Sequence, residues 1–62
     1  MNINKMINTI LIKISQEHSV FYMEKRTYKD AKIYKSYLVK IDDKTKECDN
    51  KIELLLYLKE MI

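Results

Sequence analysis

Four residues in this 62-residue chain have the chemistry of a nuclease metal site. Asp42, Asp43 and Lys44 form an Asp-x-Lys segment, the second half of such a site. The site also needs an upstream acid on an adjacent strand, and Asp30 is the only fair candidate. Asp30 falls in one predicted turn, and Asp42 and Asp43 fall in another. The chain is also too short to enclose a substrate. We therefore expect these residues to form turns and to have no nuclease activity.

The single histidine, His18, and the single cysteine, Cys48, are the other candidates for chemistry. A thiolate–imidazole pair would need contact between them in a pocket that excludes water, which 62 residues scarcely provide. A metal site from His18, Cys48 and Asp49 would lack a fourth ligand and has no recognised spacing. We expect a buried structural cysteine, a loop histidine, no metal, no cofactor and no enzymatic activity.

The cations are unevenly distributed along the chain, whose net charge is +3. Residues 24–41 contain six cations and two acids, whereas residues 42–62 contain four cations and six acids. Lysines that neutralise phosphates, with aromatic rings between them for unpaired bases, are typical of single-strand binders. The candidate nucleic-acid or partner-binding residues are Lys25, Arg26, Lys29, Lys32, Tyr34 and Lys40, with Tyr28 as a second ring. The alternative is a solvated sheet face whose lysines serve solubility and edge protection.

The hydrophobic pattern places these cations on strands between two helices. Residues 3–16 carry one apolar stripe at helical spacing, although Ile10, Ile12 and Ile14 alternate as in a strand. We predict a helix there. Composition and turn residues predict strands at residues 19–27, 31–41 and 46–48, with turns at 28–30 and 42–45. In the second strand, a period of two puts Lys32, Tyr34, Ser36 and Lys40 on one face. Ile33, Tyr37, Val39 and Ile41 share the other face.

Residues 51–61 are predicted to form the last helix, because Asn50 and Glu53 match a capping box. This helix is apolar nearly all round and must be covered on more than one side. One stripe comprises Ile52, Leu55, Leu56, Leu58 and Ile62, and the second comprises Leu54, Tyr57 and Met61. The second stripe either packs on the first helix or, if exposed, forms a dimer or partner interface with Tyr57 as its anchor.

The predicted fold class is α+β, a single domain over residues 1–62 in the order α-β-β-β-α, with a three-stranded antiparallel sheet packed on two helices. The absence of glycine excludes nucleotide-binding loops, and no apolar run approaches the length of a membrane span. A cytoplasmic protein is expected. The abundance of Lys, Ile, Asn and Tyr indicates a low-GC bacterium or its phage.

The element order is similar to that of double-stranded-RNA-binding domains. Those domains carry a Gly-rich loop between the first two strands and a run of lysines opening the last helix. Here the last helix opens with Asp49, Asn50, Lys51, Ile52 and Glu53, so the similarity stops at topology. The size and order also suit small phage inhibitors, of which some anti-CRISPR proteins are typical.

Three functional hypotheses follow. In the first, a small non-catalytic module binds nucleic acid through the basic hairpin. In the second, an anti-CRISPR-like inhibitor binds a host nucleic-acid-handling enzyme and is a candidate homodimer. In the third, the chain is a homo-oligomer whose only partner is itself. The charge pattern favours the first.

Overall fold

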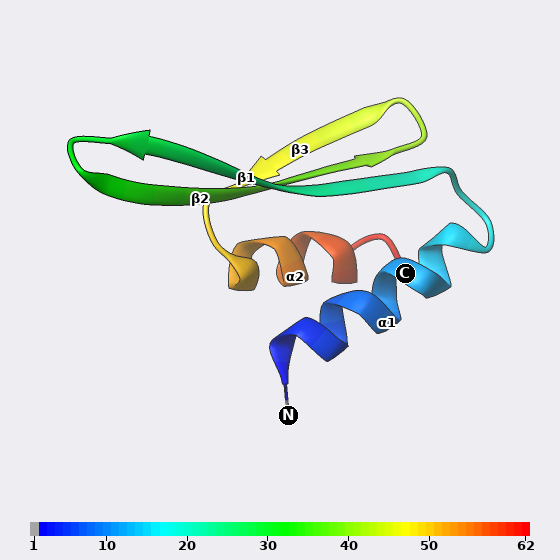
Figure 1. The fold of residues 1–62 in the computed structure, drawn as a ribbon. Helices are drawn as coiled ribbons and strands as arrows, with labels where there is room; N and C mark the ends of the chain where they lie inside the picture. The colour runs from blue at the N-terminus through cyan, green and yellow to red at the C-terminus, as the bar shows by residue number, and fades with distance from the viewer. Residues whose placement is uncertain (1) are drawn as a thin grey trace.

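Two helices lie against one face of a three-stranded sheet in the computed structural model, which describes residues 2–62 (Figure 1). The elements are α1 (Ile3–Ser15), β1 (Val20–Lys29), β2 (Lys32–Ile41), β3 (Lys44–Cys48) and α2 (Lys51–Lys59). The strands pair antiparallel in the order β1-β2-β3. The predicted α+β class and α-β-β-β-α order are confirmed. No helix within residues 2–62 is long and apolar enough to cross a membrane.

Both hairpin turns are shorter than the sequence predicts. β1 continues to Lys29 and β2 begins at Lys32, so only Asp30 and Ala31 make the first reversal. Their φ angles of 52° and 60° are those of a type I′ turn, whose twist matches that of the strands. Asp42 and Asp43 make the second reversal, with Asp42 at φ 55°. The predicted turns at 28–30 and 42–45 were therefore one and two residues too long.

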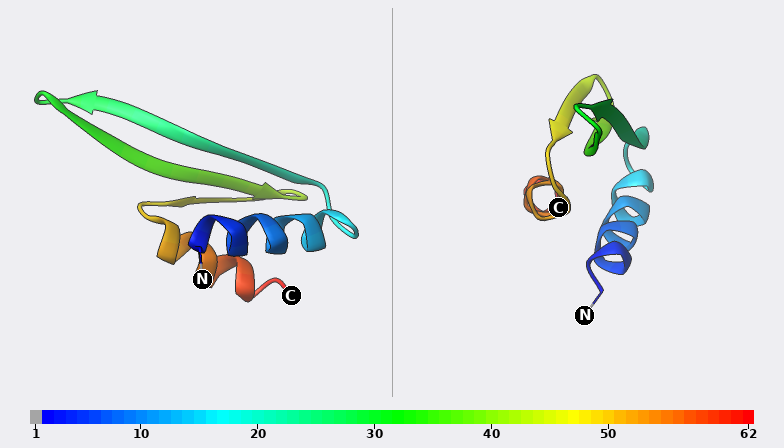
Figure 2. Two further views of the ribbon diagram at one scale, coloured as in Figure 1. Left: turned by 60° about the horizontal axis from the view of Figure 1, so that its bottom comes forward. Right: turned by 60° about the vertical axis from the view of Figure 1, so that its left-hand side comes forward.

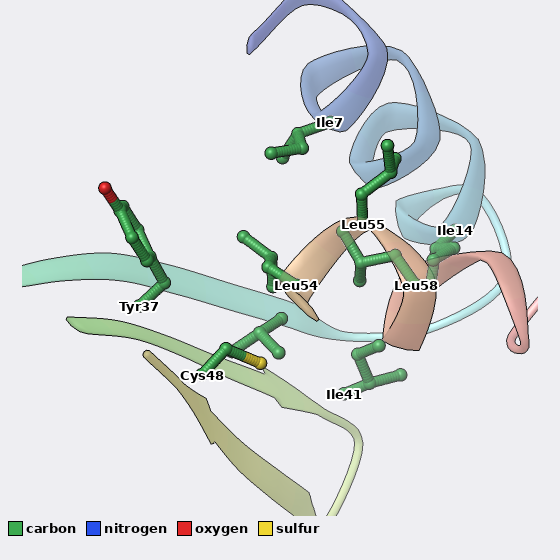
Figure 3. Packing of buried hydrophobic residues seen from close by; sticks show 9 residues of the cluster. Ile7, Ile14, Tyr37, Ile41, Cys48, Leu54, Leu55 and Leu58 are labelled. Atoms are coloured by element: carbon green, nitrogen blue, oxygen red, sulfur yellow. The ribbon is translucent and has the colours of Figure 1, made fainter. Parts of the chain in front are cut away.

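The core lies between the helices and the inner face of the sheet (Figure 3). Tyr37, Val39 and Ile41 alternate along β2 and are all buried, which confirms the predicted apolar face over that part of the strand. Cys48 on β3 is fully buried, and burial raises the pKa of its thiol. The helices contribute the remaining buried side chains: Ile7, Ile14, Leu54, Leu55 and Leu58.

Helix α2 divides its apolar residues differently from the two predicted stripes. Leu54 and Leu58 are 0% exposed and Leu55 is also buried, so the buried side combines residues of both stripes. Tyr57 and Met61 are half-buried and pack against the core. The hypothesis of an exposed Leu54, Tyr57 and Met61 interface is therefore wrong for Leu54, and the alternative of core packing holds for it. The apolar residues that α2 exposes are Ile52 and Leu56, at 64% and 59%.

Side-chain caps fix where each helix begins. The Asn2 side chain accepts a hydrogen bond from the Asn4 N–H, and that of Asn50 accepts one from the Glu53 N–H at 2.8 Å. Lys51 then ties α2 to its neighbours. Its Nζ donates to Asn4 Oδ1 of α1 at 2.6 Å and lies 5.8 Å from the centre of the Tyr37 ring on β2. These contacts position the helices against the sheet.

The β1–β2 hairpin continues beyond the helices as a two-stranded arm, which we define as residues 25–36. β3 pairs with β2 only from Tyr37 to Ile41, so the arm has no third strand. Figure 2 shows the hairpin projecting away from the two helices. The Cα radius of gyration is 12.3 Å, above the roughly 10.6 Å expected of a compact chain of this length. None of the arm residues belongs to the core.

Candidate nucleic-acid interface

The pairing register decides which cations share a face. Residues directly opposite each other in an antiparallel pair project to the same side. The buried Tyr37, Val39 and Ile41 mark the inner side, so the intervening residues of β2 point outward. Lys25 pairs with Ser36, and Lys29 pairs with Lys32. The outer face of this hairpin is therefore formed by Phe21, Met23, Lys25, Thr27, Lys29, Lys32, Tyr34, Ser36, Leu38 and Lys40.

This outer face holds four lysines and no acid from β1 or β2. Five of the six predicted binding residues lie on it: Lys25, Lys29, Lys32, Tyr34 and Lys40. Arg26 does not, because it pairs with Lys35 and shares the inner side with Tyr37. Arg26 is thus the one candidate binding residue that the outer face does not include. Lys40 lies eight residues from Lys32 along β2, or about 26 Å at ~3.3 Å per residue. It therefore lies on the part of the sheet whose inner face the helices cover, and not on the arm.

Acidic neighbours engage two of the predicted cations. Glu47 of β3 lies 3.6 Å from Lys25 Nζ, and Glu24 Oε2 accepts a 3.2 Å hydrogen bond from Arg26 Nε. Within residues 2–62, the ammonium groups of Lys29, Lys32 and Lys40 have no acidic partner within 4 Å. The charge of a cation without an acidic neighbour is not offset, so the cation attracts an anionic ligand more strongly. The lysines at the arm's end are therefore its most available charges.

The sequence reasoning missed an apolar cluster at the base of the outer face. Met23 and Leu38 pair directly across the strands, and Phe21 lies two residues from Met23 on the same side. Phe21 is 54% exposed and Met23 is 40% exposed, since no helix covers this face. The signal was the two-residue spacing of Phe21 and Met23, but only the register with β2 shows which face they occupy.

The structure does not bring the candidate catalytic residues together. Asp30 and Asp42 lie in turns at opposite ends of the ten-residue β2, about 30 Å apart at ~3.3 Å per residue. Cys48 is buried at the inner face beside Tyr37. His18 instead contacts Asp42, with its Nδ1 2.7 Å from Asp42 Oδ2. No group of three His, Cys, Asp or Glu residues within residues 2–62 could hold a metal ion.

His18 and Asp42 fasten the loop after α1 to the β2–β3 turn. Asp42 Oδ1 also accepts the Ser19 N–H at 3.0 Å, and the Asp42 N–H donates to the Ser19 carbonyl at 2.8 Å. The hydrogen bond with His18, and then that from Ser19, lowers the pKa of the Asp42 carboxyl below its ordinary value of 3.8. This geometry gives both side chains a structural role that the sequence did not reveal.

The lowered pKa of Asp42 predicts a loss of stability in acid. Its contribution is present above the ordinary value and is lost as pH falls through the lowered value in the folded state. In the variant Asp42→Asn, asparagine tolerates the positive φ at this position, but its amide does not titrate. Between about pH 5 and about pH 2, we expect the wild-type free energy of unfolding to fall more than that of the variant. Urea unfolding across this range measures the difference, and parallel curves would contradict the assignment.

The start of α2 does not present the phosphate-gripping lysines of double-stranded-RNA-binding domains. Lys51, the one lysine in its first turn, is held by Asn4 and the Tyr37 ring. The start of α2 therefore offers no cluster of free lysines for phosphate. Comparison with protein-family models, with curated proteins and with solved structures finds no match to this chain.

Proposed function

We propose that this protein is a small non-catalytic module that binds nucleic acid through the outer face of its β1–β2 hairpin. The observation that carries the proposal is the register, which gathers Lys25, Lys29, Lys32 and Lys40 on one uncovered face without an acid from either strand. Polyanions bind such a face because phosphate contacts release condensed counterions. Tyr34, 51% exposed between the lysines, packs its ring on a sugar or base.

The charge of the rest of the molecule supports this placement. Residues 42–62 carry a net negative charge, and on the outer face of β3 Glu47 offsets only Lys25. A nucleic acid is therefore attracted to the hairpin and repelled from the C-terminal third. This asymmetry orients the ligand along β1 and β2.

Salt dependence of binding tests the proposal. Four phosphate contacts predict that log K falls with log salt at a slope of about −3 to −4, since each contact contributes ~0.9. Anisotropy of fluorescein-labelled DNA and RNA oligonucleotides, titrated with the full chain at several KCl concentrations, measures the slope. A slope near zero, or no binding to any oligonucleotide at about 50 mM KCl, would remove the proposal.

A matched pair of variants locates the site. Lys29→Gln/Lys32→Gln removes two outer-face charges, whereas Lys13→Gln/Lys59→Gln removes two exposed charges from the helices. Both variants have the same net charge. We expect the hairpin variant to reduce the slope by about 2 and the helix variant to leave it nearly unchanged. Equal effects would mean that net charge, not this face, governs binding.

The apolar cluster of Phe21, Met23 and Leu38 favours a second candidate, an inhibitor that binds a host nucleic-acid-handling enzyme. Phe21 and Met23 are exposed and Leu38 beside them is half-buried. Apolar residues of this kind, flanked by cations, are suited to a protein surface with apolar and acidic groups. Association with such an enzyme would persist after nuclease treatment and depend on Phe21. Association carried by nucleic acid would be lost after that treatment.

A further inference from the structure

Cations project from both faces of the arm. Lys25, Lys29 and Lys32 lie on the outer face, whereas Arg26 and Lys35 form a directly opposed pair on the inner face. Asp30, in the turn, is the only acid among residues 25–36. Two like charges directly across a strand pair are mutually destabilising. An anionic ligand on each side of the arm would relieve this repulsion.

Nothing within residues 2–62 covers either side of the arm. Residues 25–35 are all exposed, including Tyr28 at 75% and Ile33 at 63% on the inner side. A two-stranded hairpin without further support is marginally stable in water. The left view of Figure 2 shows this ribbon extending past both helices, so both of its faces are accessible to one ligand.

The aromatic side chains of the arm are poorly placed for a single strand. Tyr34 is on the outer face and Tyr28 on the inner face, so they cannot stack successive bases of one strand. Phe21 shares the outer face with Tyr34, but Tyr34 pairs with Thr27, six residues further along β1. That separation is roughly 20 Å at ~3.3 Å per residue. A ligand with phosphates on two opposing walls fits the arm better.

We propose, resting on the proposed nucleic-acid function, that the arm enters the major groove of B-form DNA, with its two faces toward opposite phosphate backbones. A sheet with its side chains is about 10 Å thick, and this groove is about 12 Å wide and 8.5 Å deep. Lys29 and Lys32 contact one wall, and Arg26 and Lys35 contact the other. The major groove of A-form RNA is too narrow for such a ribbon.

The tip then lies nearest the base edges. Asp30 accepts hydrogen bonds from cytosine amino groups, which a carboxylate recognises in the major groove. Ile33 offers an apolar contact to thymine methyl groups. Arg26 exchanges its weak exposed pairing with Glu24 for a phosphate.

The test compares ligands of one sequence. Fluorescein-labelled duplex DNA, single-stranded DNA and duplex RNA of about 24 nucleotides are titrated with the full chain, and methyl green and netropsin serve as competitors for the major and minor grooves. We expect duplex DNA to bind at least about tenfold tighter than the others, and methyl green alone to displace the protein. Equal affinity for single-stranded DNA or duplex RNA, or displacement by netropsin, would overturn the groove assignment but leave the proposed function standing. Failure to bind any of the three would remove both.

Variants of each face complete the test. Lys29→Gln/Lys32→Gln and Arg26→Gln/Lys35→Gln should each reduce the salt slope for duplex DNA by about 2, and Lys13→Gln/Lys59→Gln should not. Circular dichroism verifies that each variant remains folded. If the inner-face pair behaves like the helix control, the two-walled contact is wrong. A dimer in sedimentation that is lost in Tyr28→Ala/Ile33→Ala would also overturn the proposal, because a second copy would then cover the inner face.

Discussion

If the proposed function is right, removing the arm should weaken nucleic-acid binding strongly without unfolding the protein. The variant replaces residues 26–35 with Asn-Gly and so joins Lys25 to Ser36, which already face each other in the register. Asn-Gly forms the type I′ turn that two-residue hairpins require. Because no residue from 26 to 35 belongs to the core, the free energy of unfolding should change by no more than about 1 kcal/mol. Affinity for duplex DNA should fall on the order of 100-fold, since four cations leave with the arm.

Urea unfolding and anisotropy on the same preparation separate the two effects of this deletion. A folded variant that retains wild-type affinity would place the site elsewhere, with the base of the outer face around Lys40 as the next candidate. An unfolded variant would contradict the conclusion that the arm lies outside the cooperative core. The helix variant Lys13→Gln/Lys59→Gln is the reference for loss of charge alone.

Two leucines on α2 are expected to differ sharply in their importance for stability. Leu54 is 0% exposed, and Leu56 is 59% exposed on the same helix. Leu54→Ala should lower the free energy of unfolding by about 2–5 kcal/mol through lost burial and a cavity. A 62-residue domain has roughly 3–9 kcal/mol in total, so this variant should be close to unfolded at 25 °C. Leu56→Ala should change stability by no more than about 0.5 kcal/mol.

The pair is well matched, because both variants exchange leucine for alanine within one helix and so share the same change in helix propensity. Thermal and urea unfolding curves provide the comparison. Similar losses in the two variants would mean that Leu56 is also covered, as it would be in a dimer through the exposed side of α2. Equal tolerance would contradict the position of Leu54 in the core.

The helices and the buried part of β2 were predictable because their patterns are local. The spacing of Ile3, Ile7 and Ile14 specifies one face of α1, and the cap at Asn50 specifies where α2 begins. The orientation of α2 was less accessible. Its apolar residues surround the axis, so the sequence could not decide which ones face the sheet, and Leu54 was open to two interpretations.

The composition of the candidate site depended on one turn. A three-residue turn over 28–30 would place Arg26 opposite Lys32 and hence among the outward lysines. The observed two-residue turn places Lys29 opposite Lys32 and sends Arg26 to the inner side. A change of one residue in loop length reverses the face of every β1 side chain, because strands have a period of two. The residue types did not indicate a two-residue turn at Asp30 and Ala31, since Ala is uncommon at positive φ.

That reversal has a consequence for motion at the arm's end. In a chain without glycine, Ala31 adopts a φ of 60°. For a residue with a Cβ, this left-handed conformation costs about 1–2 kcal/mol. We therefore expect fraying of the hairpin to start at this turn and to give fast amide hydrogen exchange in the neighbouring residues of β1 and β2. A ligand that clasps this end suppresses the fraying, so part of its binding free energy is expended on backbone ordering.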